Sequence, residues 1–85
     1  MEYYLLDVKR TCKVNGVDVA FDYINTYYYP NEAVKEAMVL SMNEEVLHAS
    51  VHKWFVNENG EHNHADDGGI LYRYEKRDNH IKEWF

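Results

Sequence analysis

The sequence predicts one α+β domain spanning residues 1–85, arranged as a two-layer sandwich with one helix packed on one face of an antiparallel or mixed sheet. Three observations predict it. A favoured hairpin pair, Asn15-Gly16, separates two stretches of alternating apolar residues, a helical pattern follows Pro30, and alternation resumes at Leu47. The expected order is β-β-α-β-β, with a further short strand at the C-terminus as an extension.

The first two strands are expected to form a hairpin with a fixed register. Apolar residues occupy most even positions from Tyr4 to Val14 and the odd positions from Val17 to Tyr23. A two-residue turn sets the pairing, and opposite charges then face each other on the other side of the hairpin. The expected partners are Val14 with Val17, Cys12 with Val19, Val8 with Tyr23, Lys13 with Asp18, and Lys9 with Asp22.

A helix of about three turns is expected after Pro30, because Val34, Met38 and Met42 recur at intervals of four residues. Ala33, Ala37 and Leu40 lie beside them, and this short stripe of small apolar residues suits packing onto a sheet. Asn31 is the expected N-cap, and Glu32 suits the positive end of the helix dipole. We predict that the core between sheet and helix consists of Leu6, Val8, Val19, Phe21, Val34, Met38, Leu47, Val51 and Phe55.

The second half of the chain predicts two or three strands around a long polar loop. Residues 47–55 alternate in strand fashion, and residues 57–69 contain no large apolar side chain. Residues 70–76 form a tyrosine-rich strand pattern, and residues 81–85 predict the last short strand. A loop as long as 57–69 is uncommon in a compact domain and is often functional, although a solvated connection with a turn at Asn59-Gly60 is the favoured explanation of this one.

Composition excludes several classes of protein. Cys12 is the only cysteine, so a disulfide framework is excluded and a reducing, cytoplasmic compartment is expected. The acids Glu2 and Asp7 stand where a secretory signal needs bases, and no apolar run is long enough to predict a membrane span. The formal net charge is −6 with no basic patch, so we expect neither nucleic-acid nor membrane binding.

The loop 57–69 supplies the candidate metal ligands, His62, His64 and Asp66. Imidazoles two positions apart on an extended chain point to the same side, and a nearby carboxylate could complete a Zn²⁺ shell. No cofactor other than such an ion is expected.

Catalytic chemistry has little support in the sequence. Ser50 lies between His48 and His52 on one strand face, but same-strand neighbours are expected to be too far apart for serine–histidine hydrogen bonds. The two histidines are expected about 13 Å apart as separate surface groups. No catalytic residue is assigned.

The expected function is therefore binding. The sheet face away from the helix is predicted to carry an interface formed by Tyr3, Leu5, Ile24, Tyr28, His52 and Trp54. The alternative is that residues 81–85 or the loop 57–69 fold over this face and cover it. The leading hypothesis is a small acidic non-enzymatic module that binds a protein partner, or a second copy as a homodimer. It would inhibit or regulate a larger macromolecule, as accessory proteins of phages and mobile elements do, including the anti-restriction and anti-CRISPR types. The alternatives are a metal- or ligand-binding protein that uses loop 57–69, and a small enzyme subunit completed by a partner chain.

Overall fold

Asn15 and Gly16 both adopt a positive φ, 52° and 81°, as the predicted hairpin turn requires. They join β1 (Glu2–Val14) to β2 (Val17–Tyr27), and every predicted cross-strand pair is confirmed, from Val14 with Val17 back along the hairpin. Lys13 Nζ lies 3.1 Å from Asp18 Oδ1, so one predicted charge pair forms an ion pair.

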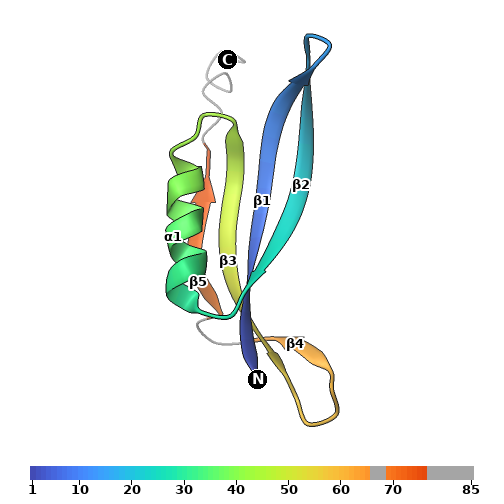
Figure 1. Cartoon of the computed structure of the whole chain (residues 1–85), viewed down its shortest axis with the longest axis vertical. Helices are drawn as coiled ribbons and strands as arrows, with labels where there is room; N and C mark the ends of the chain where they lie inside the picture. Colours follow the sequence, from blue (N-terminus) through green and yellow to red (C-terminus); the bar gives the residue numbers. More distant parts are fainter. Residues whose placement is uncertain (66–68, 77–85) are drawn as a thin grey trace, which may run out of the picture.

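The computed structural model describes residues 1–65 and 69–76. Beyond the hairpin it contains one helix and three further strands in these residues. They are α1 (Pro30–Ser41), β3 (Val46–Val56), β4 (His62–His64) and β5 (Ile70–Glu75). The helix lies on one side of the sheet, which gives the predicted α+β arrangement (Figure 1).

All described strand pairs are antiparallel. The sheet runs β2-β1-β3, and the outer edge of β3 pairs with β5 over its first part and with β4 over its last part. The order of elements is thus β-β-α-β-β-β, which matches the prediction only roughly, because the additional strand is β4. The strand predicted at 81–85 lies outside the described residues.

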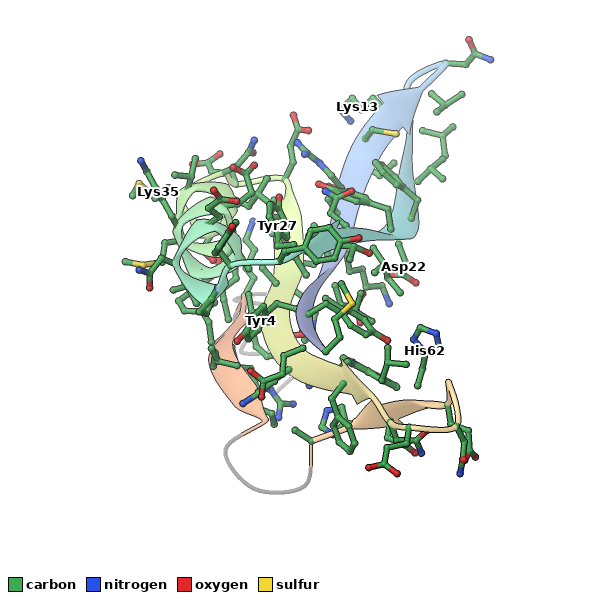
Figure 2. All side chains as sticks on the ribbon, turned by 60° about the horizontal axis from the view of Figure 1, so that its bottom comes forward. Tyr4, Lys13, Asp22, Tyr27, Lys35 and His62 are labelled. Atoms are coloured by element: carbon green, nitrogen blue, oxygen red, sulfur yellow. The ribbon has the colours of Figure 1, made fainter. Side chains whose placement is uncertain are left out.

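The core sits where α1 crosses β1, β3 and β5. Its buried apolar members are Tyr4, Leu6, Val8, Ala33, Ala37, Val46, Ala49 and Val51. Leu6, Val8 and Val51 were predicted correctly, and Val34 packs against the core while partly buried. Figure 2 shows Tyr4 and Tyr27 on the helix side of the sheet, and Asp22 and His62 on the opposite side.

The predicted helix face is confirmed for Ala33, Ala37, Val34 and Leu40 and wrong for Met38 and Met42. α1 buries Ala33 and Ala37, whereas Met38 keeps 49% of its surface exposed and Met42 is more exposed still. Small side chains occupy the contact between α1 and the sheet because they let the helix approach the sheet closely. At this short distance there is no room for the bulkier methionines. The N-cap is Tyr29 and not Asn31, since Pro30 occupies the first helical position, where its missing N–H costs nothing.

Val19 and Phe21 are also wrong as core residues, being 41% and 40% exposed. β1 pairs with β3 only as far as Arg10, so residues 11–20 form a two-stranded extension, here called the arm (Figure 1). A helix of 12 residues is about 18 Å long, whereas 11 paired strand residues span about 37 Å. One helix therefore cannot cover the whole hairpin. Leu47 is half-buried at a bulge opposite Lys9 and Arg10, and Phe55 is half-buried near the other end of β3.

The segment 57–69 is not one long loop. Its first part is a tight turn in which Asn57 Oδ1 accepts hydrogen bonds from the backbone N–H groups of Asn59 and Glu61, at 2.9 Å each. Gly60 has a φ of 80° in this turn. The chain then returns along β3 as β4, so His62 and His64 lie on a strand.

Candidate functional site

The six predicted interface residues lie on one surface. Residues opposite each other in an antiparallel pair share a face, and β1 pairs Tyr3 with Trp54 and Leu5 with His52. We call this surface, on the side of the sheet away from α1, the open face. It carries Tyr3, Leu5, Asp7, Lys9, Asp22, Ile24, Thr26, His48, Ser50, His52, Trp54, Val56, His62, His64, Arg73 and Glu75, with Tyr28 just beyond the end of β2.

The open face is hollowed in three adjoining places. A hollow of about 380 Å³ lies among Tyr3, Leu5, Tyr28 and His62. The neighbouring hollow, about 230 Å³, is lined by Leu5, Asp7, Ile24, His52, Trp54 and His64. The third, about 610 Å³, is lined by Asp7, Lys9, Asp22, Tyr23, Ile24 and His48. Leu5 and Ile24 link these hollows, so the predicted interface residues surround one shallow trough.

A chain of five hydrogen-bonded side chains crosses the open face. Glu75 Oε1 lies 2.7 Å from His48 Nδ1, and His48 Nε2 lies 3.0 Å from Ser50 Oγ. Ser50 Oγ lies 3.1 Å from His52 Nε2, and His52 Nδ1 lies 3.1 Å from His64 Nε2. β3 supplies the three central groups, β5 supplies the carboxylate and β4 supplies the terminal imidazole.

When the histidines are neutral, the Glu75 carboxylate determines which group donates and which accepts in every hydrogen bond of this series of side chains. Glu75 can only accept, so His48 Nδ1 donates to it and His48 Nε2 accepts from the Ser50 hydroxyl. Ser50 Oγ then accepts from His52 Nε2, which leaves His52 Nδ1 as the acceptor of the His64 Nε2 proton. This assignment of tautomers satisfies every link.

These contacts overturn two expectations. His48 and His52 are not separate surface groups, since both ring Nε2 atoms reach the hydroxyl of Ser50, and the serine–histidine distance is not too long for a hydrogen bond. The estimate of 13 Å followed the backbone and ignored the reach of the imidazoles toward the residue between them. The pattern His-x-Ser-x-His, with all three groups on one strand face, was the available signal.

Ser50, His48 and Glu75 have the connectivity of a nucleophile–base–orienter triad. Ser50 is nevertheless only 1% exposed, so a substrate carbonyl has no access to its oxygen. That oxygen also accepts a hydrogen bond from His52, which occupies one of its two lone pairs. The arrangement holds histidines in place and does not support acyl transfer.

The candidate metal ligands of loop 57–69 take separate partners. His62 Nδ1 lies 2.7 Å from the hydroxyl of Tyr3, whereas His64 contacts His52 and meets the Trp54 ring edge-on with centroids 5.2 Å apart. Asp66 lies outside the described residues. Within residues 1–65 and 69–76, no group of three or more ligating side chains is arranged to hold a metal ion.

Burial and neighbouring charge shift two protonation equilibria along the hydrogen-bond chain. The pKa of His52 is lowered, first by burial and next by the adjacent His64. The pKa of Glu75 is lowered, first by its hydrogen bond with His48. His52 is thus kept neutral and Glu75 is kept ionised, as the assigned direction of donation requires.

No protein-family model matches the chain, and neither a curated protein nor a solved structure matches it significantly. The α-helix of the described residues is too short and too polar to cross a membrane.

Proposed function

We propose that this protein is a non-enzymatic module that docks onto a larger protein through the open face and thereby inhibits or regulates it. The observation that carries the proposal is the apolar trough itself. Ile24 and Tyr28 are 60% and 61% exposed although they lie beside Tyr3, Leu5 and Trp54. Aromatic groups with polar tips, gathered around aliphatic side chains in a hollow, have the composition of binding hot spots.

The charge around the trough favours a partner surface that carries lysine or arginine beside an apolar side chain. Asp7 and Asp22 line the largest of the three hollows described above, together with Ile24. Lys9 lies opposite Asp22 in the hairpin register, but neither Asp22 nor Asp7 forms an ion pair among the described residues. A chain charge of −6 adds long-range attraction for a basic surface and raises the rate of association.

Two substitutions in the trough test the proposal. Leu5→Glu places a charge at its centre and Trp54→Ala removes the indole, so both should abolish retention of the partner by the immobilised chain. The matched control is Val39→Glu on the exposed side of α1, where Val39 is 53% exposed. Quantitative mass spectrometry of proteins retained from host lysate, with circular dichroism of each variant, makes the comparison.

The proposal requires a retained protein that wild type and Val39→Glu share and that both folded trough variants lose. Retention of the same protein by all four chains would place the interface elsewhere. A different result would identify a second copy of this chain as the occupant instead. In that case no protein is retained from the lysate, and the sedimentation coefficient rises with concentration for wild type but not for the two trough variants.

A further inference from the structure

We infer that His52 and His64 form a chelating pair for a divalent transition-metal ion such as Zn²⁺, with water in the remaining coordination positions. The inference goes beyond the proposed function and does not depend on it. It rests on the approach of two imidazole nitrogens from neighbouring strands, His52 Nδ1 on β3 and His64 Nε2 on β4, to 3.1 Å.

The separation of these two atoms matches that of two ligands on one ion. A Zn–N bond is about 2.0–2.1 Å, so two nitrogens at a tetrahedral angle lie roughly 3.3 Å apart. The two nitrogens therefore need to separate by only a few tenths of an ångström, and each ring must also rotate so that its lone pair points at the ion and not at the other nitrogen. They are also tilted by 55° to each other, with centroids 5.3 Å apart, so they are not stacked face to face.

The groups behind His52 orient it as a ligand. Its Nε2 lies 3.1 Å from Ser50 Oγ, and Ser50 is in turn held by His48, whose other nitrogen meets Glu75. A ring whose far N–H is engaged in this way directs the lone pair of its near nitrogen outward, which is the arrangement found behind metal-binding histidines. His64 carries its proton on Nε2 without metal, and transfer of that proton to Nδ1 frees the second ligand atom.

Negative charge beside the pair favours a cation. Asp7 lines the same hollow as His52 and His64. With two protein ligands and open positions, the site suits a borderline-soft ion that accepts nitrogen, and Mg²⁺ or Ca²⁺ should not bind.

Calorimetric titration of the full chain with ZnCl₂ at pH 7.5 tests the inference. One ion should bind per chain, and His52→Gln or His64→Gln should weaken binding at least tenfold. Ser50→Ala, which removes the group that orients His52, should weaken it by about 10-fold with the same stoichiometry. The matched control is His62→Gln on the same strand as His64, which should bind Zn²⁺ like wild type.

A second measurement avoids dependence on the folding of any variant. In ¹⁵N-resolved spectra of the wild-type imidazoles, Zn²⁺ should shift His52 Nδ1 and His64 Nε2 and leave the His62 ring unchanged. Perturbation of His62 together with His64, and not of His52, would overturn the inference in favour of a site on β4 alone. Absence of any shift at stoichiometric Zn²⁺ would overturn it altogether.

Discussion

At the scale of single residues, the hydrogen-bond chain makes stability depend on pH. The folded-state pKa of His52 lies below its ordinary value of 6.5, so the unfolded chain takes up more protons as the pH falls through that value. The folded pKa of Glu75 lies below 4.5, so the stability that it contributes is present above this value and is lost in stronger acid. Both effects act in the same direction. The groups that surround His52 are Asp7 on β1, His48 on its own strand, His64 on β4 and Arg73 on β5.

We therefore expect the midpoint of urea unfolding to fall as the pH is lowered from 7.5 to 5. His52→Gln should make the midpoint depend less on pH. Glutamine does not titrate, so the unfolded state no longer gains stability by binding a proton at this position. His62→Gln serves as the control, because His62 lies on the same face but does not belong to the hydrogen-bond chain. Its urea midpoint should fall with pH as that of wild type does. Equal pH profiles for the two variants would show that His52 is not the group responsible.

Only part of the hydrogen-bond chain could be predicted from the sequence. His48, Ser50 and His52 could have been grouped by their alternation, since one strand presents all three to one side. Glu75 and His64 could not, because they lie 27 and 12 residues from their partners and reach them only through strand pairing. The metal ligands predicted from adjacency, His62 and His64, share a strand face, but His62 contacts Tyr3 on β1, two strands away, and His64 contacts His52 on the neighbouring β3.

At the scale of elements, the hairpin was predictable and the helix face was predictable only in part. Turn chemistry, alternation and charge pairing all specify one hairpin register, and this agreement leaves no competing alignment. In α1 two adjacent stripes compete, Ala33 with Ala37 and Val34 with Met38, and hydrophobicity selects the larger side chains. The structure selects the smaller ones because the distance between helix and sheet decides which stripe fits. β4 was missed since His62–His64 has no apolar pattern and exists as a strand only through its pairing with β3.

The part of the hairpin that α1 covers should contribute more to stability than the uncovered arm. Leu6 is fully buried beneath α1, so Leu6→Ala should lower the free energy of unfolding by about 2–5 kcal/mol. Phe21 lies at the base of the arm, 40% exposed and stacked on Tyr23, so Phe21→Ala should cost only about 1 kcal/mol. Urea denaturation of both variants measures the difference. A cost for Phe21→Ala that equals that of Leu6→Ala would show that the arm is covered in solution.

At the scale of the whole molecule, the two faces of the sheet have different roles. The helix side holds every buried apolar side chain of the described core, while the open face holds the histidines, the exposed aromatic groups and the hollows. The molecule measures 50 × 30 × 21 Å, and the arm accounts for part of this elongation (Figure 1). The α+β class follows from the order of patterns along the chain. The division of the hairpin into a covered and an uncovered part follows from the unequal lengths of helix and strands, which the sequence also contains.

We expect the Asn15-Gly16 turn to set the order in which the sheet assembles. Partners in β1 and β2 lie between 3 residues apart in sequence (Val14 and Val17) and 23 apart (Tyr4 and Tyr27), whereas β1 and β3 partners lie 36 to 53 apart (Arg10 and Val46, Glu2 and Phe55). Loop closure costs more for the second pairing, so the hairpin should already be formed in the folding transition state. Gly16→Ala forces a side chain into a φ of 81° with open space around it, so the change should cost about 1–2 kcal/mol through the backbone alone. Stopped-flow kinetics should show this cost mainly as slower folding with little change in the unfolding rate, and the opposite partition would mean that β1 meets β3 before it meets β2.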